Sequence, residues 1–234
     1  MSKPKAQKDV NTWDLDFKMH NDFDLLDTHL SFKDLTTKYT TRMVLADGPA
    51  GTAKTYLAVM SALELLKKQA MESIIYIRSV VESASQKMGS LPGEVDDKFL
   101  PWSMPLVEKL DELVGIPIRQ NLMSSGVVEC IPVNFVRGLT FRNSVVIVDE
   151  AQNLTTSELV TILTRFGDNS KYIVVGDTRQ SDINGKTGFE PIFKCFDNKE
   201  SEDEGIYTFK FTDSDIVRSE ILKFIIGQLD LLKT

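Results

Sequence analysis

A glycine-rich segment between a short apolar run and an amphipathic stretch constrains the fold of this chain more than any other feature. The apolar run covers residues 43–46, and helical periodicity covers residues 55–70. The segment that joins them, with the first helical residue, is Gly48-Pro49-Ala50-Gly51-Thr52-Ala53-Lys54-Thr55. It follows the pattern G-x-x-x-x-G-K-[ST], in which backbone N–H groups at a helix N-terminus surround phosphate oxygens. The sequence therefore predicts a phosphate-binding loop inside a strand–loop–helix unit.

Three residues at the end of this loop carry specific expectations. Lys54 is predicted to contact the terminal phosphates, and the Thr55 hydroxyl is predicted to bind Mg²⁺. Ala53 departs from the pattern, because a glycine is usual at that position. Its methyl group must fit beside the phosphates, so we predict a φ below zero there. The alternative interpretation is a glycine-rich turn that only caps an ordinary helix.

Further apolar runs alternate with amphipathic stretches along the chain. Helices are predicted over residues 156–165 and 214–232. Strands are predicted over residues 73–77, 127–131, 144–148, 172–175 and 207–211. Because these runs are apolar throughout, both faces of each strand are expected to be buried, as in a parallel sheet covered by helices. The sequence therefore predicts an α/β fold with a mainly parallel central sheet flanked by helices.

Polar residues follow two of the predicted strands. Asp149 and Glu150 come directly after residues 144–148, and strand ends in parallel sheets are where ligands bind. Asp149 is predicted to bind Mg²⁺, and Glu150 to orient or deprotonate an attacking water. Gln180, beyond the strand at 172–175, is expected to sense the γ-phosphate. The alternative for Asp149 and Glu150 is a helix N-cap followed by an acid in the first turn. The alternative for the segment before Gln180 is an ordinary Gly-Asp turn at a strand end.

Composition limits the partners and the location of the chain. Lys and Arg number 27 against 34 Asp and Glu, a formal charge of −7, so any nucleic-acid site must be local. Two cysteines cannot build a disulfide framework or a zinc site by themselves. The N-terminus lacks the apolar region of a signal peptide, and no run of about 18 apolar residues occurs. We therefore expect a cytoplasmic protein without a membrane partner.

With these elements in place, the chain resembles the PhoH-like family of P-loop ATPases, which is related to the core of superfamily-one helicases. The resemblance covers roughly residues 40–230. Besides the phosphate loop, it includes the strings Arg78–Glu82, Lys87–Gly93, Phe135–Thr140, Asp149–Asn153, Leu163–Arg165, Gly176-Asp177 with Gln180, and Asp215–Arg218. It implies a P-loop NTPase fold, with a single RecA-like domain that binds and hydrolyses ATP with Mg²⁺. It also implies helicase-like action on single-stranded RNA or DNA.

The resemblance suggests how the chain is divided into segments and that an arginine is needed to complete the nucleotide site. We expect a lead-in at residues 1–39 and the ATPase domain at residues 40–234, with an insertion at about 80–115 that projects from the sheet. Helicases carry a second RecA-like domain whose arginines complete the site, and we expect none after Leu232. Arg165 or Arg218 is therefore expected to complete it, within the chain or across a homo-oligomer, which we expect to be a hexameric ring. Each arginine could instead serve only a helix dipole or a local ion pair.

Two groups of basic and aromatic residues are candidates for a single-strand groove. They are Arg78, Lys87, Lys98, Phe99 and Trp102, and Phe135, Arg137, Phe141 and Arg142. Acidic residues lie among the first group, and the aromatic side chains could instead pack against the core. A second function therefore stays open, an ATP-dependent switch or assembly protein that acts on a protein partner without nucleic-acid stimulation.

Overall fold

The fold is built on one parallel sheet. The computed structural model describes residues 17–19, 24–79, 95–180, 187–217 and 228 of the 234-residue chain. Within these ranges, six strands pair in the order β3-β2-β4-β5-β1-β6, and every pairing is parallel. The strands are β1 (Met43–Asp47), β2 (Ser73–Arg78), β3 (Val128–Cys130), β4 (Ser144–Asp149), β5 (Lys171–Gly176) and β6 (Ile206–Lys210). The predicted parallel α/β fold, of the RecA-like P-loop type, is confirmed.

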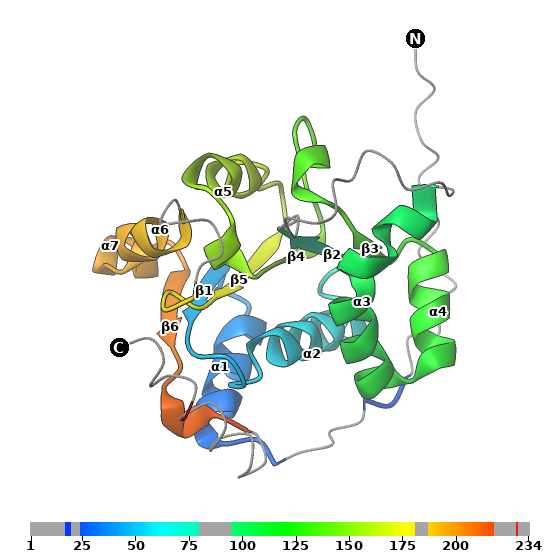
Figure 1. Cartoon of the computed structure of the whole chain (residues 1–234), viewed down its shortest axis with the longest axis horizontal. Coiled ribbons are helices and arrows are strands. Elements are labelled where there is room, and N and C mark those ends of the chain that lie inside the picture. Colours follow the sequence, from blue (N-terminus) through cyan, green and yellow to red (C-terminus); the bar gives the residue numbers. More distant parts are fainter. Residues whose placement is uncertain (1–16, 20–23, 80–94, 181–186, 218–227, 229–234) are drawn as a thin grey trace.

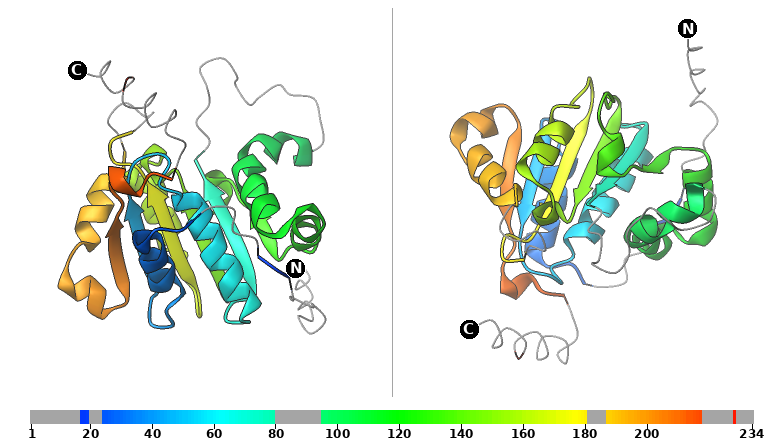
Figure 2. Two further views of the ribbon diagram at one scale, coloured as in Figure 1. Left: turned by 90° about the horizontal axis from the view of Figure 1, so that it is seen from below. Right: turned by 45° about the horizontal axis from the view of Figure 1, so that its top comes forward.

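Helices cover both faces of this sheet (Figures 1 and 2). The α-helices are α1 (Asp27–Thr37), α2 (Lys54–Lys67), α3 (Val95–Val114), α4 (Ile116–Ser124), α5 (Thr156–Leu163), α6 (Phe189–Phe196) and α7 (Lys199–Asp203). Short 3₁₀ turns are η3 (Val133–Phe135), η4 (Ala151–Asn153) and η5 (Asp213–Asp215). Helices α1 to α4 pack against one face, and α5 and α6 against the other. In the described part of the chain, no helix is both long and apolar enough to cross a membrane.

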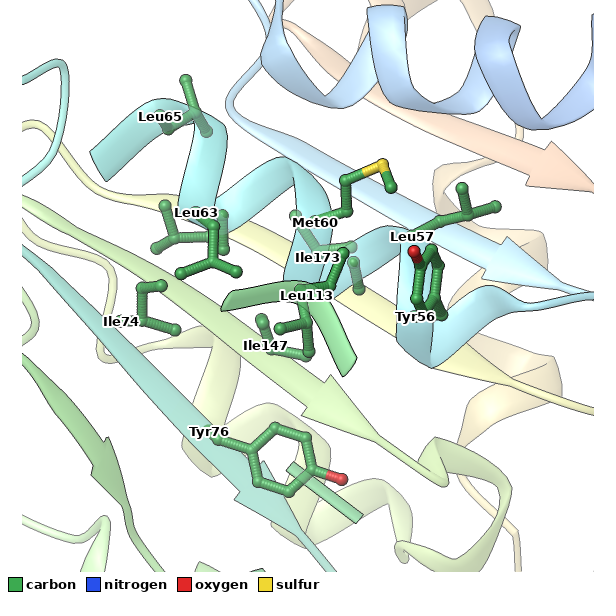
Figure 3. Packing of buried hydrophobic residues seen from close by; sticks show 14 of the residues in the cluster. Tyr56, Leu57, Met60, Leu63, Leu65, Ile74, Tyr76, Leu113, Ile147 and Ile173 are labelled. Atoms are coloured by element: carbon green, nitrogen blue, oxygen red, sulfur yellow. The ribbon is translucent and has the colours of Figure 1, made fainter. Parts of the chain in front are cut away.

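Alternate residues of each strand supply the two halves of the core. Val44 of β1 belongs to the cluster that contains α2, whereas Leu45 belongs to the cluster on the opposite face. Both are fully buried, as the continuous apolar runs predict. Figure 3 shows the α2 side of the core, where Leu63 lies near Ile74 and Ile147 of the neighbouring strands. This packing fixes the start of α2 next to the carboxyl ends of the strands.

Two expectations about irregular segments were wrong. The segment at about 80–115 was expected to project, yet its residues 95–114 form α3, whose Leu106, Leu110 and Leu113 are fully buried. Residues 80–94 lie outside the described residues. Their spacing of three and four residues places them on one face of the helix, which packs beside α2. The last helix does not begin at Ser214, because residues 213–215 form a 3₁₀ turn. Most of the remaining predicted helix lies outside the described residues.

Helix α1, from the expected lead-in, is attached to the sheet by a buried lysine. Phe32 of α1 is fully buried in the same cluster as α2. Lys171, only 2% exposed, donates hydrogen bonds to the carbonyl oxygens of Thr36 (2.8 Å) and Lys38 (2.7 Å) at the end of α1. Burial lowers the pKa of Lys171 to about 8. Unpaired carbonyls at a helix C-terminus are thus satisfied by an amine whose charged form is costly to bury.

This burial predicts a pH-dependent stability. Between pH 8 and 10.5 the folded chain has lost the Lys171 proton, whereas the unfolded chain still holds it. Stability therefore rises with pH across this window. Relative to Lys171→Met, the free energy of unfolding of the native chain is expected to increase by about 2 to 3 kcal/mol between pH 7 and 10. Urea denaturation of both proteins at several pH values measures this difference, and a constant difference would contradict the shifted pKa.

Candidate nucleotide-binding site

The glycine-rich loop lies at the carboxyl end of β1 and leads into α2. Helix α2 begins at Lys54, and Gly51 has a φ of 92°. Gly48 tolerates no side chain, because a Cβ there would lie 2.6 Å from Cβ of Phe211. The chain leaves β1 toward α2 on one face and leaves β5 toward α6 on the other. A ligand crevice is expected where neighbouring strands diverge in this way.

A cavity of about 330 Å³ occupies this place. Loop residues on its wall are Ala50, Gly51, Ala53, Lys54 and Thr55. Residues from the other strand ends on its wall include Asp149, Glu150, Gln152, Asp177 and Gln180. The structure thus gathers the loop and the residues predicted after β4 and β5 around one cavity.

Ala53 corrects one prediction. Its φ is 58°, in the left-handed region, and not below zero as expected. The turn therefore retains the backbone shape that a glycine would adopt here without penalty, and the methyl group is accommodated at a cost. The expected negative φ follows from the backbone preference of alanine alone, but the surrounding loop and helix determine the conformation.

Ala53→Gly is expected to raise the free energy of unfolding by up to about 1 kcal/mol, because relief of the left-handed strain exceeds the added entropy of the unfolded chain. Equilibrium urea denaturation measures the change. Ala50→Gly is the matched control, since Ala50 is not among the residues with positive φ. That variant should lose stability, and an equal loss in Ala53→Gly would contradict the strain at Ala53.

Lys54 is folded over the phosphate loop. Its Nζ donates to the carbonyl oxygens of Gly48 (2.5 Å) and Pro49 (2.8 Å). Burial lowers the pKa of Lys54, and the carboxylates of Asp177 and Glu150 oppose that shift. The ammonium group is therefore held beside the place that phosphates would occupy, among acids that favour its charged form.

Asp149 and Thr55 are directly linked. The Thr55 hydroxyl donates to Oδ1 of Asp149 over 2.8 Å. The Tyr76 hydroxyl donates to the other carboxylate oxygen, Oδ2. Within the described ranges, no group of three or more His, Cys, Asp or Glu residues could hold a metal by itself. Thr55 and Asp149 nevertheless fit Mg²⁺, which is commonly held by one or two carboxylates together with substrate phosphates.

Glu150 lies next to these groups on the cavity wall. Its backbone has a φ of 52°, so the chain turns sharply after β4. Gln152 Nε2 donates to Glu150 Oε2 over 2.6 Å, and an Arg78 guanidinium nitrogen lies 3.6 Å from Oε1. Burial and then the Asp149 charge raise the pKa of Glu150, while Gln152 and Arg78 lower it. A carboxylate with raised proton affinity beside a phosphate site suits a general base.

Gln152 connects the ends of β4 and β5. Besides its contact with Glu150, its Oε1 accepts a hydrogen bond from the backbone N–H of Asp177 over 3.1 Å. The Asp177 Oδ2 atom is buried and has no hydrogen-bond partner among the residues that the structure describes. Gln180 lies on the cavity wall three residues further on, and its role as a sensor of the γ-phosphate stays a prediction. In the sequence, Gln152 is only part of the string Asp149–Asn153, and the pattern predicts no role for it.

Helix α3 also contributes to the cavity, which the sequence did not suggest. Lys109 and Glu112 line it and form an ion pair of 2.8 Å with each other. The sequence pattern that could have identified these two residues is weak, because an i,i+3 charge pair is common on exposed helix faces.

The segment after β6 also reaches the phosphate loop, because the N–H of Val217 donates to the carbonyl oxygen of Gly51.

Of the two candidate arginines, the structure describes only Arg165, and it does not bring Arg165 to this cavity. Arg165 follows the carboxyl end of α5, and its carbonyl accepts from the N–H of Phe141, before β4 begins. Asp149 marks the other end of β4, so Arg165 lies at the edge of the sheet opposite its own phosphate loop. Completion of the site by Arg165 from within the chain is therefore wrong. Arg218 lies outside the described residues.

Comparisons with known proteins point to one family. The family model described as "PhoH-like protein" matches residues 31–230. A PhoH-like protein of Bacillus subtilis (strain 168) is 36% identical over 193 residues, which is 80% of this chain and 58% of that protein. A PhoH-like protein of Mycobacterium tuberculosis (strain ATCC 25618 / H37Rv) is 36% identical over 186 residues, covering 79% and 51%.

Protein PhoH of Escherichia coli (strain K12) is 35% identical over 184 residues, covering 77% of this chain and 51% of that protein. The chain thus spans about half the length of the curated relatives that it matches. Most of the chain is included in each match, and the range that the family model matches contains the phosphate loop and the strand-end acids of this chain. The chain belongs to the PhoH family.

Proposed function

We propose that the chain binds ATP with Mg²⁺ and hydrolyses it. The observation that carries this proposal is the Thr55–Asp149 hydrogen bond, which unites the phosphate loop with the acid at the end of β4. Lys54 and the loop amides would hold the phosphates, and Glu150 would orient or deprotonate the water. Mg²⁺, held by Thr55 and Asp149, would supply positive charge to the transferred phosphoryl group.

Turnover is proposed to be coupled to single-stranded RNA or DNA, in a helicase-like manner. The resemblance to superfamily-one helicases supports this, as does the loop after β3. There Phe135 is 63% exposed, and Arg137 and Leu139 are also exposed. An exposed aromatic ring beside a cation can stack with a base and contact phosphate. Phe141, proposed with this group from the sequence, is buried in the core and cannot act as a stacking platform.

The homo-oligomeric ring, which we expect to be hexameric, belongs to the same proposal. Arg165 lies at the far edge of the sheet from its own cavity, so it can complete a site only in another subunit. Arg218 is the second candidate for this role. An arginine supplied by a neighbour raises phosphoryl-transfer rates by about 10³–10⁵ in other enzymes. Turnover per subunit should therefore increase with protein concentration.

The test is the steady-state ATPase rate with Mg²⁺, with and without single-stranded RNA or DNA, at low and raised salt. If the polynucleotide raises the ATPase rate and this effect decreases as salt rises, the result would support binding to the phosphate backbone. Phe135→Ala should weaken that stimulation, whereas Tyr39→Ala, which removes an exposed aromatic side chain between α1 and β1, should not. An ATPase rate that polynucleotide does not change would favour the switch that acts on a protein partner. Absence of ATP hydrolysis would contradict the proposed enzymatic activity.

A further inference from the structure

Strand β2 carries a tyrosine whose hydroxyl is directed to the predicted metal site. Tyr76 lies in a strand that is otherwise apolar at its buried positions, and it is fully buried. Its side chain is on the α2 face of the sheet, and Figure 3 shows the hydroxyl pointing toward the end of β4. There it donates a hydrogen bond to Oδ2 of Asp149. A residue of the core thus contacts an acid that lines the functional cavity.

The two hydrogen bonds to Asp149 hold both of its oxygens. Thr55 occupies Oδ1 from the phosphate loop, and Tyr76 occupies Oδ2 from the neighbouring strand. Asp149 is only 3% exposed, so few other donors can replace either contact. A carboxylate held at both oxygens cannot rotate about its side-chain bonds without losing a bond that is costly to break in a buried site.

A phenol is suited to act as a permanent donor, because a tyrosine hydroxyl keeps its proton at neutral pH. The Tyr76 hydroxyl can therefore donate to Asp149 without a change of protonation. Strand β2 also carries Arg78, which lies 3.6 Å from Glu150, so one strand supplies a partner to each of the two acids.

We propose that Tyr76 is a positioning residue for Mg²⁺, because its hydrogen bond fixes the Asp149 carboxylate in the orientation that binds the ion. This inference rests on the proposed Mg²⁺–ATP function. Groups that orient metal ligands typically change metal affinity or activity by about 10- to 100-fold when they are removed. Tyr76 is not among the residues that line the cavity, so its loss should act on the metal and spare nucleotide binding itself.

The experiment compares binding of a fluorescent, non-hydrolysable ATP analogue in EDTA and in saturating Mg²⁺. Mg²⁺ is expected to tighten binding to the native chain. Tyr76→Phe should lose about 10-fold of that gain. Its dissociation constant in EDTA should stay near the native value, which also shows that the variant is folded. The variant keeps the ring in the core, and Asp149 still accepts from Thr55.

Tyr172→Phe is the matched control. Tyr172 is equally buried, but it lies on the other face of the sheet and donates to the carbonyl oxygen of Ile162 over 3.4 Å. A full Mg²⁺ gain in Tyr76→Phe, or an equal loss in Tyr172→Phe, would overturn the positioning role and leave the proposed function intact. A native chain that gains nothing from Mg²⁺ would overturn both.

Discussion

Lys54→Ala is expected to abolish measurable ATP turnover and to weaken nucleotide binding severely. Lys54 is the only cationic residue of the phosphate loop, and its Nζ is already held over the loop by the carbonyls of Gly48 and Pro49. Removal of one preorganised charge or donor at a transition state costs about 100- to 1,000-fold in rate. Lys109 also lines the cavity, but it is paired with Glu112 and extends from a different helix.

The matched control for this prediction is Lys68→Ala. Lys68 caps the other end of α2, is 61% exposed and pairs with Glu64, so the variant removes the same charge far from the cavity. It should retain native turnover and native affinity. Turnover by Lys54→Ala at the rate of Lys68→Ala would mean that the loop does not hold the reacting phosphates.

The elements that position the site could be predicted because each carries a local signal. The phosphate loop has a fixed spacing, and its neighbouring strand is short and apolar. The strand that ends in Asp149 and Glu150 is buried along its whole length, which is why an unbroken apolar run identified it. Parallel pairing then brings the strand ends to one edge, so the sequence could anticipate that loop and acids meet.

The parts that could not be predicted depend on contacts between distant residues. Tyr76 looks like any aromatic residue in a buried strand, and only the register of β2 and β4 shows that it reaches Asp149. Ala53 adopts a left-handed backbone because its surroundings require it, against its own preference. The sequence around Phe141 suggests a possible stacking platform, but its side chain is buried by packing that the local sequence does not encode.

Glu150→Gln is expected to bind Mg²⁺–ATP with near-native affinity and to lose hydrolysis by about 10²- to 10⁴-fold, the usual contribution of a general base. The replacement keeps the size of the side chain, and its carbonyl oxygen can still accept the amide of Gln152. The Thr55–Asp149 pair and Lys54 are unchanged. The variant should therefore hold ATP without turning it over, which single-turnover hydrolysis and retention of labelled nucleotide on the protein can measure.

Glu112→Gln separates a base at Glu150 from a base elsewhere on the same cavity. Glu112 also lines the cavity, but it lies on α3, where it is paired with Lys109. Glu150 lies beside Asp149 at the end of β4, and burial together with the Asp149 charge favours proton uptake by its carboxylate. We therefore expect Glu112→Gln to retain most of the native rate. If Glu112→Gln instead traps ATP while Glu150→Gln still hydrolyses it, the base belongs to α3 and the role assigned to the end of β4 is wrong.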